Sequence, residues 1–352
     1  MKFETITIKD IAKALNLSVS TVSKALRKSY EISQETQKLV LDYAEKHNYK
    51  PNPVAQGLRK GKSRLIGVIV TNIDNNFFSQ VINGIESVAH KKGYTVIITQ
   101  THESYEREVI TAQNLMTRSP DGLLVSLCAE TANVDHFKEI HHKGLPIVFF
   151  DRVTNDIDTH KVTCNNFHGA YEATKHLAQQ GFQRIAHITS SNNLSITLER
   201  LEGYLKALED NGLQIDERYI KYCVHGGMIQ EETRAAVNEL LAMHDKPDAI
   251  FTASDRLSTT TFSILCEEGI KMPVQMGMAG FTNSLSAHIF NPPLTTIVQP
   301  AFEMGQKATE MLIQLIESKQ PPARYEKKVL DAALVIRQSS LKKKILRKAA
   351  AD

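Results

Sequence analysis

Short apolar runs alternate with amphipathic stretches along most of the chain, from residue 65 onward. The runs have the length and β-branched content of buried strands, and the stretches between them repeat apolar positions with the period of a helix. These β–α units recur about every 25–30 residues, which predicts doubly wound parallel sheets with right-handed crossovers. A single sheet built from all these units would be too large for one hydrophobic core, so we expect an α/β fold with two subdomains. The expected strands are LIGVIV, YTVIITQ, DGLLVSL, PIVFFD, RIAHITS, YIKYCVHG, AIFTAS and GMAGF.

Residues 1–50 follow a different pattern, which predicts three short amphipathic helices. Thr7 precedes IKDIAKAL, and Asp10 completes a capping box in which Asp replaces the usual Glu or Gln. Ser18 before VSTVSKAL and Ser33 before QETQKLVLDYAEKHN can N-cap two further helices. The sequence therefore predicts an all-α head with a small core, formed by Ile8, Ile11, Ala12, Leu15, Val22, Ala25, Leu26, Val40, Tyr43 and Ala44.

Two short helices joined by a tight turn at Asn16-Leu17 and braced by a third helix are typical of a helix-turn-helix DNA-binding module. Hydroxyl groups can bond phosphates or base edges, valine can contact a thymine methyl group, and lysine can reach guanine or phosphate. An ordinary three-helix bundle without DNA function is the alternative at this point. Near its start the second helix would expose Val19, Ser20, Thr21 and Lys24.

Residues 51–62 form a basic segment punctuated by proline. Asn52 and Pro53 suit the cap and first position of a short helix, which Gly57 weakens by about 1 kcal/mol relative to alanine. A helix this short is marginal in water, so this hinge helix should form only when something packs on it. Leu58 is an apolar residue in basic surroundings, and it is a candidate minor-groove wedge while Arg59 holds a phosphate.

Charge is distributed unevenly, although the net formal charge is only +3. Residues 1–62 carry +6, residues 342–352 carry +4, and residues 63–341 carry −7. A basic head on an acidic body indicates that only the head meets a polyanion such as DNA. The basic tail, residues 342–352, is expected to be a solvated chain end.

The sequence lacks the characteristic motifs of several classes of protein. No signal-peptide pattern is present and no apolar run approaches the roughly 18 residues of a membrane span, so we expect a cytoplasmic protein with no membrane partner. The cysteines have no CxxC spacing and are expected to be reduced, buried thiols. GxSxG, HExxH and Walker A motifs and paired metal-ligand spacings are absent, so we expect neither an enzyme nor a cofactor.

Three stretches resemble the lactose-repressor (LacI/GalR) family of bacterial transcription regulators, namely IKDIAKALNLSVSTVSKAL, ISQETQKLVLDYAEKHNYKPN and VAQGLRKGKSRLIGVIV. The resemblance covers almost the whole chain and implies a periplasmic-binding-protein-like body, in which the chain crosses three times between subdomains. The crossings are expected near Val162–Asn165, Pro292–Thr296 and Glu326–Leu330. The N-terminal subdomain would then comprise residues 63–163 and 295–327, and the C-terminal subdomain residues 164–294 and 328–341.

The resemblance also implies how the head binds DNA. In the family, the position of Leu58 inserts into the minor groove at the centre of a palindromic operator, together with that of its dimer mate. The positions of Val19, Ser20 and Lys24 read bases in the major groove. A homodimer is expected, because the tail is too short for a leucine-heptad helix that would form tetramers. The expected DNA-binding residues are Thr7, Ser18, Val19, Ser20, Thr21, Lys24, Tyr49, Asn52, Ala55, Leu58 and Arg59.

The function implied is that of a repressor whose interdomain cleft binds a small carbohydrate or related metabolite. The ligand would shift the population between two arrangements of the N-terminal subdomains, and so change the spacing of the hinge helices. A corepressor in place of an inducer, as purines are for some relatives, stays open. The rival classes are a sugar-binding receptor, which would leave the head unused, and an enzyme, which would need a motif that is missing.

Candidate effector-binding residues follow from the strand ends, because ligands of open α/β sheets bind there. Asn76, Phe77 and Phe78 begin a helix after LIGVIV, where an aromatic ring can either stack on a ligand or pack in the core. His102 follows YTVIITQ, where a histidine is more often a surface residue than a ligand contact.

Charged candidates occupy other strand ends. Asp151 and Arg152 follow PIVFF, where a carboxylate can bond hydroxyls and a guanidinium can clamp anions. The family places a ligand-binding arginine at the position of Arg200. Asp255 can bind ligand or cap a helix, and Asn283 lies at the end of the GMAGF strand.

Two departures from the family remove carboxylates. The family often has Asp after the Gly-Tyr or Gly-Phe pair where this chain has Thr282, and Asp-Asn where it has Cys164-Asn165. Fewer carboxylates favour a more anionic or less hydroxylated ligand.

Overall fold

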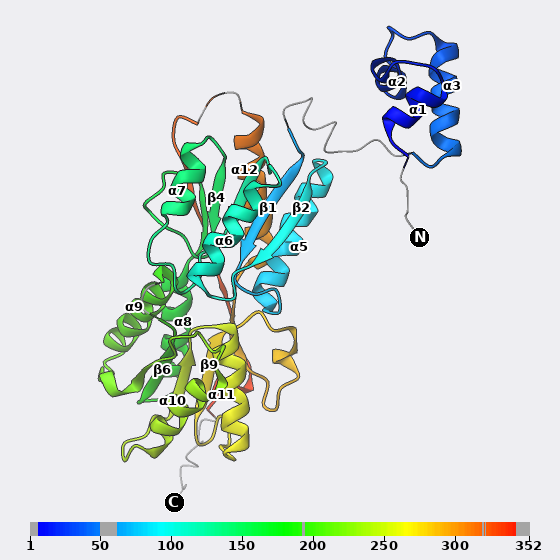
Figure 1. Cartoon of the computed structure of the whole chain (residues 1–352). Helices are drawn as coiled ribbons and strands as arrows, with labels where there is room; N and C mark the ends of the chain where they lie inside the picture. The colour runs from blue at the N-terminus through cyan, green and yellow to red at the C-terminus, as the bar shows by residue number, and fades with distance from the viewer. Residues whose placement is uncertain (1–5, 50–61, 192–193, 319, 321, 343–352) are drawn as a thin grey trace, which may run out of the picture. The chain divides into compact units, whose positions relative to one another are not determined.

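Residues 6–49, 62–191, 194–318, 320 and 322–342 are described by the structure, a computed structural model (Figure 1). The chain divides into two compact units, Met1–Ser63 and Arg64–Asp352. Within the described ranges, none of the helices combines the length and the apolar character of a membrane span. The expected hinge helix and most of the basic tail lie outside these ranges.

The head consists of three helices, α1 (Ile8–Ala14), α2 (Val19–Leu26) and α3 (Gln34–Lys46). Thr7 Oγ1 accepts a hydrogen bond from Asp10 N at 3.4 Å, while Asp10 Oδ2 accepts one from Thr7 N at 2.8 Å. This confirms the predicted capping box. Ser18 and Ser33 cap α2 and α3 through their side-chain oxygens, which accept hydrogen bonds from Thr21 N and Thr36 N. The buried core consists of Ile11, Ala12, Val22, Ala25, Val40 and Ala44.

Thr7→Ala is expected to lower the unfolding free energy of the head by about 1 kcal/mol, because Asp10 N loses its acceptor and Asp10 Oδ2 loses the hydroxyl donor of Thr7. Thermal unfolding of the full chain, followed by circular dichroism, measures the effect as a lower midpoint for the helical head. The transition of the Arg64–Asp352 unit serves as an internal control and should not move. A head midpoint equal to that of the parent chain would show that the capping box contributes nothing.

The Arg64–Asp352 unit contains two six-stranded sheets. The first is wholly parallel in the order β11-β5-β4-β3-β1-β2. Helices α5 and α12 lie side by side on one face (Figure 1), and α6 and α7 pack on the other. Burial of both faces explains why its central strands are apolar throughout. Its elements are β1 (Leu65–Val70), α5 (Asn76–Lys91), β2 (Thr95–Gln100), α6 (Tyr105–Met116), β3 (Gly122–Val125), α7 (Asp135–His142), β4 (Ile147–Phe150), β5 (Lys161–Cys164), α12 (Ala301–Glu317) and β11 (Lys327–Leu330).

The second sheet has the order β12-β10-β9-β8-β6-β7, with only β12 antiparallel to its neighbour. Helices α8 and α9 pack on one face, and α10 and α11 on the other. Its elements are α8 (Asn166–Gln179), β6 (Ile185–Thr189), α9 (Ser195–Asp210), β7 (Ile220–Tyr222), α10 (Gln230–Ala242), β8 (Ala249–Thr252), α11 (Asp255–Glu267), β9 (Gly277–Phe281), β10 (Thr295–Val298) and β12 (Ala333–Val335), with 3-10 turns at Glu217–Tyr219, Leu285–His288 and Gln338–Ser340.

The two later crossings between the sheets lie a few residues beyond the expected positions. β10 pairs with β9 in the second sheet, so the chain crosses after it, at Gln299 and Pro300. β11 pairs with β5 in the first sheet, so the last crossing follows at Asp331 and Ala332. The boundaries at 295 and 328 were therefore misplaced, because a short strand does not reveal in its own sequence which sheet it joins.

The cysteines are all free, but one departs from the expectation of burial. Cys128, Cys164 and Cys223 are buried, whereas Cys266 is exposed on α11. Cysteine spacing indicates the absence of a disulfide framework but not the burial of a single thiol.

Candidate functional site

The start of α2 forms the candidate DNA-contact surface of the head. Val19 is 42% exposed and Ser20 is exposed, whereas Val22 and Ala25 of the same helix are buried in the core. The helix therefore exposes Val19 and Ser20 to solvent, whereas Thr21 and Lys24 are half-buried. Which of them contact DNA stays a prediction.

Four of the expected DNA contacts already have partners within the head. Thr7 and Ser18 are N-caps, and Thr21 Oγ1 lies 2.8 Å from Ser18 Oγ. The Lys24 ammonium group forms an ion pair with the Glu31 carboxylate. The predicted contact of Lys24 with DNA would therefore require it to exchange Glu31 for a phosphate or base.

The end of α3 brings Tyr49 back onto the head. Tyr49 N donates to Ala44 O at 2.8 Å and the side chain packs partly buried against the core, and this burial raises the pKa of its hydroxyl. Tyr30, after α2, is 96% exposed. No pattern in the sequence singled it out, because a single aromatic residue in a loop has no periodicity. The predicted contacts Asn52, Ala55, Leu58 and Arg59 lie outside the described residues.

In the body, Asp151 and Arg152 follow β4 at its carboxyl end, as predicted. Asp151 is 4% exposed and has a φ of +57°, a left-handed conformation that only a few non-glycine residues adopt. Burial raises the pKa of its carboxyl group, while the charges of Arg152 and Arg200 oppose that shift. Arg152 Nη1 bonds the Glu103 carboxylate at 2.7 and 3.0 Å. The charge of Arg152 is thus compensated mainly by Glu103.

Arg200 reaches the same region from α9 of the second subdomain. Its Nε and Nη2 donate to Asn166 Oδ1 at 2.9 and 2.7 Å, and Nη1 donates to the carbonyl oxygen of Ala253. The guanidinium carbon lies 4.0 Å from the centre of the Phe281 ring. Burial lowers the pKa of Arg200, and the Asp151 carboxylate opposes this. The two subdomains therefore place opposite charges near each other at the carboxyl ends of the strands.

Asn283 links the two subdomains through its hydrogen bonds. Its Nδ2 donates to Gln80 Oε1 at 2.9 Å and to Gln299 O at 2.8 Å, and its Oδ1 accepts from Gln299 N at 3.0 Å. Both polar atoms of its side-chain amide are hydrogen-bonded, and the residue is only 5% exposed. A role of Asn283 in direct ligand contact is therefore not favoured. Sequence reasoning missed Gln80 and Gln299, since polar residues in helices and loops normally read as surface.

The other candidate effector-binding residues differ in burial and in hydrogen-bond partners. Phe77 and Phe78 are both buried in the core of the first sheet, with ring centroids 5.2 Å apart, so packing is the better interpretation. Asn76 opens α5 half-buried, and His102 Nδ1 lies 2.9 Å from Asn72 Oδ1.

At the start of α11, the Asp255 carboxylate accepts a hydrogen bond from the Thr282 hydroxyl group. Asp255 is half-buried, and Thr282 is the residue at which the family often has a carboxylate.

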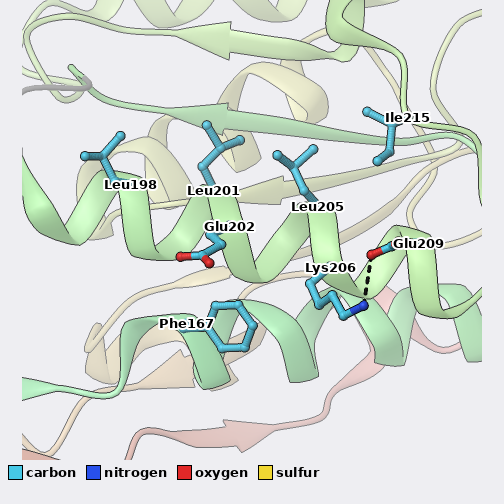
Figure 2. A pocket seen from close by; sticks show the side chains of 8 residues that line it. All are labelled: Phe167, Leu198, Leu201, Glu202, Leu205, Lys206, Glu209 and Ile215. Carbon is cyan, nitrogen blue, oxygen red and sulfur yellow. Dashed lines mark hydrogen bonds and ion pairs between the residues drawn. The ribbon is translucent and has the colours of Figure 1, made fainter.

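A hollow of about 670 Å³ lies on the outer face of α9, away from these strand ends. Figure 2 shows Leu198, Leu201 and Leu205 along one side of the helix, with Phe167 and Glu202 on another. Leu201 and Leu205 also pack against the core of the second sheet. The hollow contains none of the predicted effector residues.

Comparison with known families accounts for both units. The model described as "Bacterial regulatory proteins, lacI family" matches residues 7–52, and "Periplasmic binding proteins and sugar binding domain of LacI family" matches residues 63–332. The chain belongs to the LacI family of bacterial regulatory proteins. This LacI-family chain is a DNA-binding transcriptional regulator with a helix-turn-helix head and an effector-binding body.

Its similarity to individual LacI-family members extends over nearly the full length. The HTH-type transcriptional repressor PurR of Vibrio atlanticus (strain LGP32) is 32% identical over 327 residues, which are 92% of this chain and 95% of that repressor. The lac repressor dimer bound to operator and the anti-inducer ONPF shares the fold, with a TM-score of 0.79 at 24% identity over 96% of this chain and 100% of that chain. The transcription regulator GntR from Chromobacterium violaceum gives a TM-score of 0.69 at 25% identity, covering 78% of this chain and 99% of the other.

Proposed function

We propose that this LacI-family chain is a homodimeric cytoplasmic repressor whose cleft binds a small carbohydrate or related metabolite that changes its affinity for a palindromic operator. The observation that carries the proposal is the pair formed by Asp151 and Arg200. Each is buried, each comes from a different subdomain, and each charge influences the pKa of the other group at the carboxyl ends of the strands. A ligand that bonds both groups would hold the subdomains together.

Further polar atoms at the strand ends suit a hydroxyl-bearing ligand. Thr101 follows β2, Ser126 follows β3 and Thr189 ends β6, and the hydroxyl groups of all three are buried. Among the described residues these hydroxyl groups have no hydrogen-bond partner. Buried polar groups are usually hydrogen-bonded, so a ligand rich in hydroxyl groups would complete the site. The arginines give little support to a more anionic ligand, because Glu103 and Asp151 already compensate them.

The homodimer is supported by exposed apolar side chains on the second subdomain. Leu285 and Ile289, at the two ends of one 3-10 turn, are 75% and 71% exposed. Large exposed apolar residues that lie together mark interaction surfaces. A second copy would cover them and place two heads on the two halves of a palindrome.

Lys24→Ala is expected to weaken binding about tenfold on a palindromic duplex that the full chain selects, and to flatten the salt dependence of binding. Fluorescence anisotropy at several salt concentrations measures both effects. Lys38→Ala, at an exposed position on α3, is the matched control and should change affinity less than about twofold. Equal losses for both variants would show that α2 is not the recognition helix.

A further inference from the structure

The segment Asn72–Gln80, between β1 and the second turn of α5, contacts the second subdomain at three places, namely the loop before α10, the start of α11 and the loop after β9. Asn72 Nδ2 lies 3.5 Å from Met228 Sδ, and Asp74 Oδ1 accepts from Arg256 Nη2 at 2.6 Å. Gln80 Nε2 donates to Asn283 O at 3.1 Å. These contacts make the segment the main described side-chain link from α5 to the opposite subdomain.

The Gln80 end of this segment lies beside a crossing between the sheets. Gln80 and Asn283 exchange hydrogen bonds through their side chains and backbone, and Asn283 is bonded in both directions to the backbone of Gln299. Gln299 is the residue at which the chain passes from β10 to α12. This amide network therefore ties α5 to the axis about which the subdomains can rotate.

Close packing makes α5 move together with α12. A Cβ atom at Gly84 of α5 would stand 2.1 Å from Phe302 O, and one at Gly305 of α12 would stand 2.1 Å from Val81 O. Helices in such contact leave no room for sliding, so a displacement of α5 is a displacement of the α5–α12 layer.

The Asp74 end of the segment lies farther from the crossings. Asp74 follows β1, which is three strands away from the crossing strand β5, and Arg256 follows β8, two strands away from β10. With neighbouring strands about 4.8 Å apart, these offsets are roughly 14 and 10 Å. A rotation at the crossings would thus separate Asp74 from Arg256 while it leaves Gln80 and Asn283 together.

We propose that the Asp74–Arg256 ion pair is a latch that holds the effector cleft closed, with the Gln80–Asn283–Gln299 network as its pivot. The latch is suited to opening, because the Asp74 side chain is 67% exposed and that of Arg256 is 29% exposed, so water can replace either partner. The inference rests on the proposed function in one respect. A latch that favours the closed cleft raises the fraction of chains competent to hold a ligand there, and so tightens apparent affinity.

The latch is tested by hydrogen exchange on the full chain without ligand or duplex. Asp74→Asn is expected to raise exchange two- to fivefold in peptides covering 71–80 and 223–230, since an exposed ion pair shifts an equilibrium by about that factor. Asp74→Arg and Arg256→Asp should each do the same, and the double charge reversal should restore the parent rates. Arg234→Gln removes an equally exposed pair with Glu267, at 2.7 Å within the second subdomain, and should leave these peptides unchanged.

Unchanged exchange in the single variants, or no restoration in the double variant, would overturn the latch. Because neither ligand nor DNA is present, this outcome is independent of whether the chain proves to be an effector-controlled repressor. A regulator that binds operator without any ligand response would leave the exchange result standing.

Discussion

Replacing Arg200 by methionine is expected to lower the unfolding free energy of the Arg64–Asp352 unit by about 3–5 kcal/mol. Methionine retains most of the aliphatic volume above Phe281, so the loss is chiefly electrostatic. The side-chain oxygen of Asn166 and the carbonyl of Ala253 lose their buried donor, and Asp151 loses an opposing charge in a desolvated site. Urea unfolding of the full chain, followed by circular dichroism, measures the difference.

Two further variants separate this explanation from general damage. Arg234→Met removes an exposed arginine that pairs with Glu267, and should cost at most about 1 kcal/mol. Adding Asp151→Asn to Arg200→Met should recover part of the stability, because no uncompensated carboxylate is then buried. A stability of Arg200→Met close to that of the parent chain would mean that Asp151 and Arg200 do not depend on each other.

His187 is expected to make the second unit sensitive to acid. The ring is fully buried on β6, with centroids 4.9 Å from Tyr204 and 4.7 Å from Phe251, and Nδ1 lies 3.1 Å from Phe251 O. Burial lowers the pKa of His187 from 6.5 to about 3. A histidine held neutral in the folded state stabilises it above pH 6.5, and that contribution is lost as the pH falls toward 3, at about 1.4 kcal/mol for each pH unit.

His187→Phe keeps the stacked ring but cannot take up a proton. We therefore expect the unfolding free energy of the parent chain to fall below pH 6.5 more steeply than that of the variant, with a constant difference above it. Urea unfolding between pH 4.5 and 8 measures the two profiles, and His244→Phe, at a 99% exposed side chain, controls for the replacement itself. Parallel profiles for the parent chain and His187→Phe would contradict the burial of a neutral imidazole.

Local sequence signals predicted most of the secondary structure. The capping residues Thr7, Ser18 and Ser33 begin the three head helices, because a cap acts on the backbone within one turn. The long apolar strands of both sheets were also found. The short strands β5, β10, β11 and β12 were not among the expected strands, since their pairing depends on residues far away in the chain.

Fewer residues of the candidate site could be predicted from the sequence. Asp151 and Arg200 could be found because a charged residue after an apolar strand, or in a family motif, is conspicuous. Asn166, Gln80 and Gln299, which hold these and neighbouring groups, are ordinary polar residues in the sequence. Asn166 bonds Arg200 only after α8 and α9 pack together, and the roles of Gln80 and Gln299 arise where the crossings join the two subdomains.

The most direct test of the central claim is selection of bound duplexes from a random DNA pool by the full chain, at near-physiological salt and with or without a metabolite extract. The expected result is a palindrome with a flexible pyrimidine–purine step at its centre, enriched to a different extent when the extract is present. Salt-sensitive binding to every duplex, with no enriched sequence under either condition, would contradict an effector-controlled dimeric repressor.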